Sequence, residues 1–180
     1  MNHISVGRRL LLASIGVALS TMLFRAQLAD ALVNRGDDLL FRNQLGAARL
    51  YYGRAMQIDP SSAVAVDRFA FFGMEQRTAR AIAESVEAAS WFLAKHPDNS
   101  DVLLDRALCY QLRRQYALAA QDFADAAKKS HDARYYTFAG WAALRAGRPQ
   151  AARQLWRAAL QVRPAFEPAR HALQTNGPAE

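Results

Sequence analysis

The sequence predicts an all-α protein in which pairs of helices repeat along the chain behind one apolar N-terminal helix. Three observations lead to this fold class. Residues 26–172 follow a helical, alanine-rich pattern with no strand-like alternation of polar and apolar residues. Small residues, aromatic residues and prolines recur at fixed offsets within this stretch. Residues 10–24 form an uncharged, mainly apolar run between arginines.

The composition excludes several classes of protein. With 180 residues, of which 52% are hydrophobic and 22% charged, the chain can bury a core and is not a disordered polar polymer. Its single cysteine, Cys109, excludes an internal disulfide, and we expect a small buried residue there. The four histidines are scattered, so we expect no metal site. The sequence contains no phosphate-binding loop or catalytic triad pattern, so we expect no cofactor and no enzymatic activity.

The apolar run is short for a membrane-spanning helix but has favourable flanks. Arg8 and Arg9 precede it and Arg25 follows it. A spanning helix needs about 17–25 residues, and arginine side chains at both ends can reach the interface and lengthen the effective span. We therefore interpret residues 10–28 as a membrane anchor or signal helix behind a basic N-terminal tail at residues 1–9.

Two alternatives to an uncleaved anchor stay open, a cleaved signal peptide and a mitochondrial presequence. The best small-x-small cleavage site, Ala18-Leu19-Ser20, would leave Met22-Leu23-Phe24 near the start of the mature chain. No proline or glycine interrupts the helical pattern after this site, so a peptidase would not find an extended segment there. Because basic residues favour the cytoplasmic side, we expect a single-pass protein of the inner (cytoplasmic) membrane whose C-terminal body is periplasmic.

Three segments of the body share one spacing of small and aromatic residues. A glycine or alanine is followed by alanine after 12 residues, by an aromatic residue after 16 and by alanine after 19. A fourth segment, which starts from Gly73, is degenerate because Ser85, Ala89 and Phe92 stand at these offsets. The regular copies are Gly36 with Ala48, Tyr52 and Ala55; Ala107 with Ala119, Phe123 and Ala126; and Gly140 with Ala152, Trp156 and Ala159.

This spacing resembles that of the tetratricopeptide repeat family, whose unit is a helix–turn–helix of about 34 residues. The small residue lets the two helices approach closely, and we expect the aromatic residue to fill the gap to the next pair. The resemblance implies a right-handed superhelical α-solenoid of about four repeats plus a C-terminal capping helix. The predicted segments are repeat 1 at 29–62, a degenerate repeat 2 at 63–99, repeat 3 at 100–132, repeat 4 at 133–164, and a capping helix with a disordered tail at 165–180.

In this family the first helices of the pairs line a concave groove that binds peptides or helices. Asp and Leu stand where the best-understood variant has the Lys and Asn of a carboxylate clamp, so we do not expect such a clamp. In the second repeat the groove positions are Asp67, Ala70 and Met74. The resemblance implies a protein partner, bound as a peptide or an amphipathic helix. The alternative is that Trp141 and Leu144 pack under the capping helix. The candidate groove residues are Asp101, Leu104, Leu108, Gln111, Arg134, Thr137, Trp141, Leu144 and Arg145.

Arginines are concentrated at the C-terminal end, where residues 133–180 contain seven of them against two acids, Glu167 and Glu180. Such a surface could meet anionic lipid headgroups, an acidic protein or nucleic acid. We favour a solvated outer face, because aromatic side chains are not interleaved as they are in nucleic-acid platforms. The candidate basic face comprises Arg148, Arg153, Arg157, Arg163 and Arg170.

These features together predict a non-catalytic, membrane-tethered adaptor or scaffold, accessory to a bacterial envelope, secretion or pilus assembly. One alternative is a soluble exported repeat protein after cleavage of the signal. The other is a module that binds polyanions or anionic lipids through the C-terminal arginines. Self-association through an end of the solenoid is compatible with each of these three hypotheses.

Overall fold

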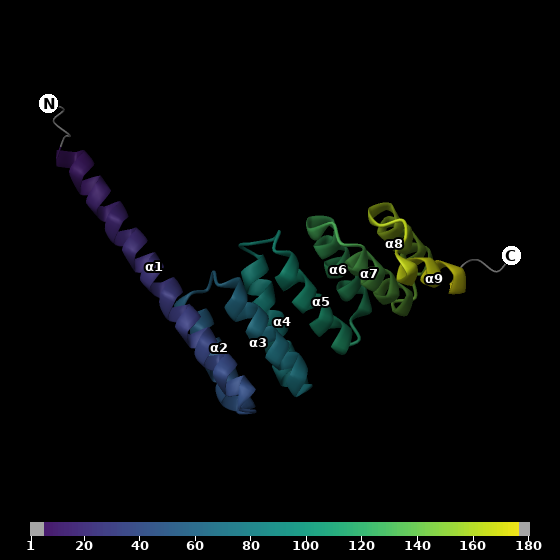
Figure 1. Cartoon of the computed structure of the whole chain (residues 1–180), viewed down its shortest axis with the longest axis horizontal. Coiled ribbons are helices and arrows are strands. Elements are labelled where there is room, and N and C mark those ends of the chain that lie inside the picture. Colours follow the sequence, from purple (N-terminus) through teal and green to yellow (C-terminus); the bar gives the residue numbers. More distant parts are fainter. Residues whose placement is uncertain (1–5, 177–180) are drawn as a thin grey trace. The chain divides into compact units, whose positions relative to one another are not determined.

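The computed structural model describes residues 6–176, with side chains from residue 14 onward, and every regular element in that part of the chain is an α-helix. Predicted features on residues 1–5 and 177–180, which belong to the basic tail and the disordered tail, lie outside the described residues. The chain divides into two compact units, Met1–Ala65 and Val66–Glu180. The described helices are α1 (Val6–Phe41), α2 (Leu45–Ile58), α3 (Ala63–Gln76), α4 (Ala79–Leu93), α5 (Ser100–Leu112), α6 (Tyr116–Ser130), α7 (Ala133–Arg145), α8 (Pro149–Val162) and α9 (Glu167–Thr175) (Figure 1).

In the first unit, α1 is one helix that contains both the apolar run and the first helix of repeat 1. It begins at Val6 and continues through residue 28 without a break. Its second half packs on α2 and buries Ala29, Val33 and Leu39. Arg25 Nε donates a hydrogen bond to the Ile58 carbonyl oxygen at 2.9 Å, at the C-terminus of α2. This bond satisfies one of the carbonyl groups that a helix leaves free at its end.

The aromatic residue of repeat 1 packs within its own helix pair. A Cβ atom at Gly36 would collide with the Tyr52 ring, which is fully buried. The Tyr52 hydroxyl donates to Asp37 Oδ1 at 2.7 Å. The ring therefore fills the space inside its own helix pair. Glycine is required here because the ring occupies the space of a side chain.

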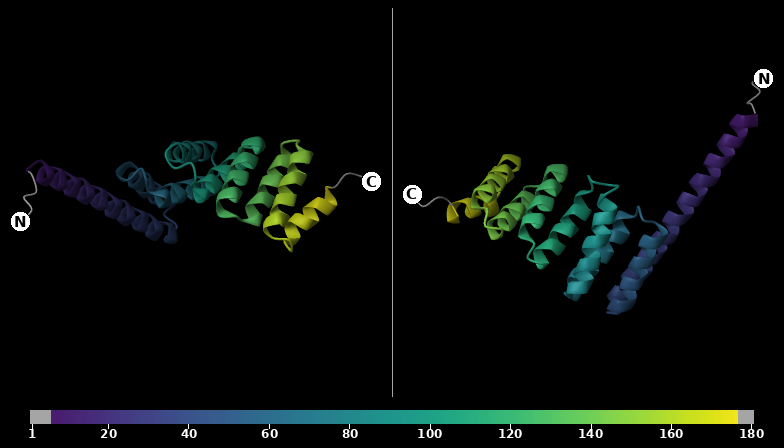
Figure 2. Two further views of the ribbon diagram at one scale, coloured as in Figure 1. Left: turned by 90° about the horizontal axis from the view of Figure 1, so that it is seen from above. Right: turned by 180° about the vertical axis from the view of Figure 1, so that it is seen from behind.

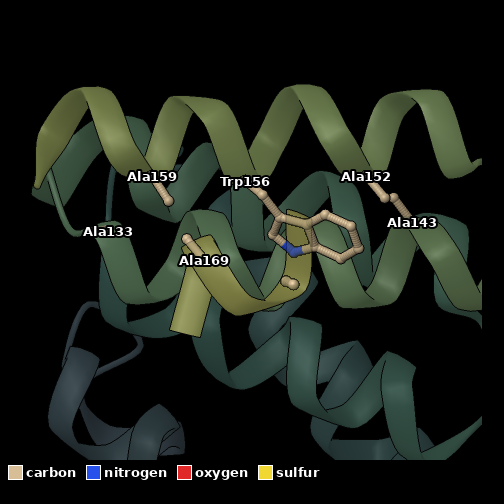
Figure 3. Packing of buried hydrophobic residues seen from close by; sticks show 7 residues of the cluster. Ala133, Ala143, Ala152, Trp156, Ala159 and Ala169 are labelled. Carbon is tan, nitrogen blue, oxygen red and sulfur yellow. The ribbon is translucent and has the colours of Figure 1, made fainter. Parts of the chain in front are cut away.

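In the second unit, α4 to α9 pack on one another in chain order, each helix against the next, and Figure 2 shows them side by side. The last core cluster surrounds Trp156 of α8, whose indole lies among small residues of α7, α8 and α9 (Figure 3). A Cβ atom at Gly140 would collide with this indole. Trp156 Nε1 donates to the Thr137 carbonyl oxygen at 3.3 Å. Trp156 thus fills its own pair and also supports the capping helix α9.

The turns within the helix pairs share one conformation. A residue with positive φ follows the first helix of each pair, which is the left-handed geometry that closes an α-helix. In three of the pairs the next backbone N–H donates to a carbonyl five residues earlier, at 2.8 to 2.9 Å, as in a Schellman motif. The positive-φ residues are Asn43 (φ 58°), Arg77 (51°), Arg114 (58°) and Gly147 (74°).

These turns correct the register of the second repeat. Gly36, Ala107 and Gly140 each lie seven residues before their positive-φ residue. The same count from Arg77 gives Ala70, which is fully buried, so Ala70 and not Gly73 occupies the small-residue position. The predicted register was three residues late, and Ala70 is not a groove residue. Gly73 instead makes room for Ser85, whose hydroxyl donates to the Ala81 carbonyl oxygen at 2.9 Å.

Candidate functional site

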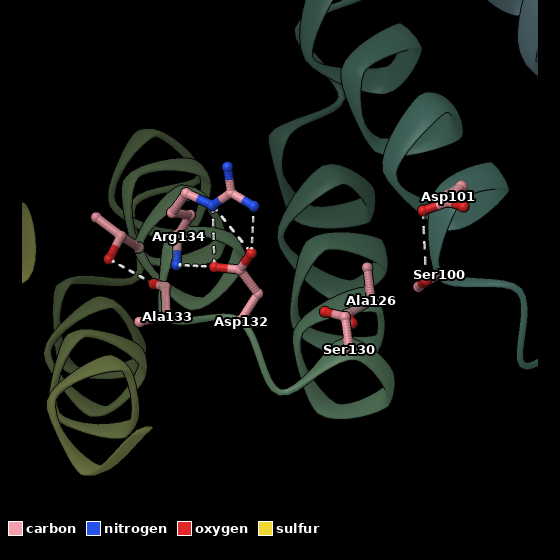
Figure 4. A network of polar contacts seen from close by, with 8 residues as sticks. Ser100, Asp101, Ala126, Ser130, Asp132, Ala133 and Arg134 are labelled. Atoms are coloured by element: carbon pink, nitrogen blue, oxygen red, sulfur yellow. Dashed lines mark hydrogen bonds and ion pairs between the residues drawn. The ribbon is translucent and has the colours of Figure 1, made fainter. Parts of the chain in front are cut away.

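Three carboxyl groups of α3 and α5 form an acidic cluster, which comprises Asp67, Asp101 and Asp105. The Asp67 side chain is 39% exposed and Asp101 is exposed, whereas Asp105 is only 7% exposed. Asp105 Oδ2 is buried and, while both acids are ionised, meets no hydrogen-bond donor among the described residues. Asp101 accepts a long hydrogen bond from Ser100 Oγ at 3.5 Å (Figure 4). The cluster therefore has two accessible carboxylates above one buried carboxyl group.

Burial and like charges make Asp105 a weak acid. Desolvation is the largest cause, followed by the charge of Asp67, a hydrogen bond to Asp67 and the charge of Asp101, and together they raise the pKa of Asp105 to about 8. Two ionised carboxylates can only accept hydrogen bonds, so a proton on Asp105 supplies the donor that the pair lacks. Burial and the charge of Asp105 raise the pKa of the neighbouring Cys109 thiol to about 12. The predicted buried cysteine is confirmed, because Cys109 is fully buried.

A cavity of about 220 Å³ lies between the C-terminal ends of α3 and α5. It contains two candidate groove residues, Leu108 and Gln111, together with Met74 of the second repeat. The wall combines apolar side chains with one acid and one base, so it can accept an amphipathic surface. The lining residues are Met74, Glu75, Arg77, Leu108, Gln111 and Leu112.

A second cavity, of about 340 Å³, lies where the α5–α6 turn meets the end of α7. It contains the candidate residue Arg145, whose guanidinium lies 5.6 Å from the centre of the Tyr116 ring. The structure thus separates Arg145 from Leu108 and Gln111, although the sequence assigned all three to one groove. The other lining residues are Arg114, Gln115, Ala117, Leu118 and Ala146.

The remaining candidates on α7 have different environments. Thr137 is buried and its hydroxyl donates to the Ala133 carbonyl oxygen at 2.9 Å, so its assignment to the groove is wrong. Trp141 is 38% exposed, and its ring lies edge-on to Trp156 with centroids 5.0 Å apart. Leu144 is half-buried against the core cluster that includes α9, as the packing alternative predicted. Trp141 alone of these three presents a large exposed surface.

Two further candidates are engaged locally. Arg134 is exposed and its Nε donates to Asp132 Oδ2 at 2.9 Å, while its backbone N–H donates to Asp132 Oδ1 at 2.8 Å (Figure 4). The Arg134 hydrogen bond lowers the pKa of Asp132, the N-cap of α7. Leu104 is half-buried and packs against the core cluster of α5, α6 and α7. Both residues therefore contribute to the helix pairs themselves.

Sequence reasoning missed Asp105, although the sequence contains a signal for it. Asp105 lies three residues after Val102 and four before Cys109, and both of these residues are fully buried. These offsets place all three on one face of α5. An acid within an apolar stripe is the pattern of a buried carboxyl group. Sequence reasoning also missed the ion pair of Arg106 and Asp122, with Nε–Oδ2 at 2.7 Å.

The candidate basic face is partly used in packing. Arg153 Nη1 donates to the Asn176 carbonyl oxygen at 3.3 Å, and Arg170 Nη1 donates to Glu167 Oε1 at 2.7 Å. The Arg163 guanidinium lies 5.4 Å from the centre of the Phe166 ring. These three arginines thus contact α9 or the residues that flank it. Arg148 and Arg157 are exposed.

The first half of α1 is the other candidate surface. Large apolar side chains between Ile15 and Phe24 are 46–68% exposed. Within the described residues, the stretch Ser14–Phe41 is long and apolar enough to cross a membrane by length and composition. The helix thus changes from an exposed apolar segment to a packed repeat helix without interruption.

Helix pairs closed by left-handed turns, small residues at the helix contacts and a short final helix define an all-α solenoid of the tetratricopeptide repeat type, preceded by an apolar helix. Comparison with solved structures finds the same fold elsewhere. A crystal structure of the MamA protein superposes with a TM-score of 0.69 at 12% identity, over 83% of this chain and 81% of that one. A tetratricopeptide repeat protein from Parabacteroides merdae gives 0.66 at 18% identity, over 83% of this chain and 59% of that one. Pseudomonas aeruginosa pilF gives 0.61 at 20% identity, over 87% and 79%.

At these identities the likeness shows the fold alone. A scan against protein-family models found no match, and a search of curated proteins found no sequence relative.

Proposed function

We propose that this chain is a non-catalytic, membrane-tethered adaptor that binds a segment of a partner protein on the first helices of its repeats. The main support for the membrane tether is the exposed apolar surface of α1 from Ile15 to Phe24. In water such a surface is unfavourable by about 25 cal/mol per Å², whereas a bilayer would cover it. Arg25 is bonded to α2, so the tether continues directly into the first helix pair.

The groove between α3 and α5 supports the binding role. Its cavity offers apolar side chains beside charged ones, which suits one face of a helix or an extended segment. Trp141 and Phe71 add exposed aromatic surface on α7 and α3, and aromatic residues are enriched where proteins bind each other. The mechanism is positioning, because a tethered groove raises the concentration of its partner at the membrane.

The cellular setting of the proposal is an accessory role in a bacterial envelope, secretion or pilus assembly. Its support is an analogy at the level of the fold. The proposed location is the inner membrane with the repeats in the periplasm, supported by the arginine pair before the apolar run. The continuous helix through Ala18–Ser20 supports an uncleaved segment, because a peptidase requires extended substrate.

The test is membrane fractionation of the full-length, C-terminally tagged chain, with intact mass and protease access to the body. A full-mass protein in the carbonate-resistant fraction is expected. Leu19→Arg should release it, because an arginine at the centre of a span opposes insertion by about 2.5–3.5 kcal/mol. Leu50→Arg is the matched control, since Leu50 of α2 is 54% exposed and Leu19 is 55% exposed. A soluble protein short by about 20–30 residues would show a cleaved signal and overturn the tether.

A further inference from the structure

Asp67, Asp101 and Asp105 form an acidic cluster on α3 and α5. Stabilisation of the helices by their acidic residues does not account for all three. An acid in the first turn of a helix interacts favourably with the helix dipole, which accounts for Asp101 at the start of α5. Asp105 lies one turn further on, nearly buried, with one oxygen that meets no donor among the described residues while both acids are ionised. A buried carboxylate that faces like charges opposes folding. Arg68 Nη1 lies 3.4 Å from Oδ2 of Asp67, the accessible carboxylate of α3.

We propose that the acidic cluster binds a lysine or arginine side chain of the partner segment, so that the groove selects partners with a basic residue. This proposal rests on the proposed function, because it specifies the chemistry of the partner that the groove accepts. A cationic side chain supplies the donors that Asp105 Oδ2 lacks. It can approach from solvent over Asp67 and Asp101, which are accessible. Charge complementarity of this kind gives specificity to an interface.

The cavity between α3 and α5 indicates which second side chain the partner segment needs beside its basic residue. Leu108 and Leu112 provide apolar wall, and Glu75 and Arg77 contribute one charge of each sign. Asp101 and Leu108 are seven residues apart on α5, which is about 10 Å along the helix axis. A partner therefore needs an apolar side chain at this distance from its basic one. That spacing corresponds to i and i+7 on a helix, or to i and i+3 on an extended segment.

A metal ion is the competing occupant of an acidic cluster. Among the side chains that the structure describes, no group of three or more metal-ligating residues is arranged to hold an ion. An organic cation needs only hydrogen-bond acceptors, and the cluster provides these. Calcium and magnesium additions are therefore included as an arm of the experiment.

The experiment selects binders from a displayed library of random 12-residue peptides on the full-length protein in detergent micelles. The wild-type protein should enrich peptides with Lys or Arg at a fixed spacing from an apolar residue. Asp105→Asn keeps the side-chain shape but cannot release a proton and become a carboxylate when a cation binds, so it should lose this enrichment. Asp125→Asn is the matched control, because Asp125 of α6 pairs with Lys128 at 3.2 Å outside the cluster.

A selected peptide is then compared with its variant in which norleucine replaces the basic residue. We expect at least a tenfold weaker binding of the norleucine peptide to wild-type protein, and less than a twofold difference on Asp105→Asn. Equal losses on both proteins would overturn the acidic-cluster proposal. Enrichment of apolar peptides without a basic residue would overturn the acidic-cluster proposal but would still support a partner-binding groove. Selection of no peptide would overturn both proposals, and competition by 1 mM Ca²⁺ or Mg²⁺ alone would reassign the cluster to a metal.

Discussion

The clearest physical consequence of the buried carboxyl group is a loss of stability as the pH rises, which Asp105→Asn should remove. The pKa of Asp105 in the folded chain is raised from 3.8 to about 8, because the group is buried beside Asp67 and Asp101. Between these two values the folded chain holds a proton that the unfolded chain has released. Stability is therefore fully present below the unfolded pKa and decreases as the pH rises toward the folded one.

The magnitude follows from one proton. Each pH unit inside the window changes the free energy of unfolding by about 1.4 kcal/mol. From pH 5 to pH 7 the wild-type chain should thus lose about 2–3 kcal/mol relative to Asp105→Asn. Asparagine resembles the protonated acid in shape, so the two proteins should have similar stability at pH 5. Titrating groups away from the cluster are common to both proteins and cancel in the difference, and the Cys109 thiol, with a pKa raised to about 12, stays protonated from pH 5 to pH 7.

The assay is urea unfolding of full-length protein in detergent, followed by far-ultraviolet circular dichroism at pH 5, 6 and 7. Asp125→Asn serves as the control, because Asp125 is accessible and pairs with Lys128. A stability difference between wild type and Asp105→Asn that stays constant within about 0.5 kcal/mol from pH 5 to pH 7 would refute the reasoning. That result would mean that Asp105 is ionised and satisfied in the folded chain.

Three further predictions concern packing, turns and the thiol. Trp156→Ala should lower the free energy of unfolding by about 3–5 kcal/mol, because it empties the fully buried site between α7, α8 and α9; a loss under about 1 kcal/mol in the same urea titration would contradict this packing. Arg114→Gly should raise stability by about 0.5–1 kcal/mol, since φ is 58° there and a left-handed residue without Cβ is less strained; unchanged or lower stability would argue against the turn geometry. Cys109 should react with a maleimide at pH 7 only after unfolding, because it is buried and its pKa is raised to about 12; rapid labelling of the folded protein would contradict this.

The spacing of small and aromatic residues predicted the helix pairs because it reflects contacts inside each pair. Gly36 with Tyr52 and Gly140 with Trp156 are such contacts. The predicted register of the second repeat was wrong because it placed Gly73 at the small-residue position. In the structure Ala70 occupies that position. The deciding feature is the left-handed Arg77, and arginine carries no sequence preference for that conformation.

The candidate site was predicted in part. Leu108 and Gln111 line a cavity because a groove position is determined by its place on the first helix. Thr137 occupies an equivalent position, but its hydroxyl bonds to its own helix and the residue is buried. The acidic cluster depends on a side-chain contact between α3 and α5, which no local pattern in the sequence could establish.

The most direct test of a tethered, partner-binding groove is site-specific photocrosslinking in the native membrane. A photoreactive amino acid at Leu108, in the cavity, should form a protein adduct in the carbonate-resistant fraction. Leu112→Glu should abolish this adduct, because it places a charge on the exposed cavity wall. The same probe at Lys128, which is exposed on α6, should form none. Equal adducts at both positions, no adduct at Leu108, or a soluble protein would contradict the account.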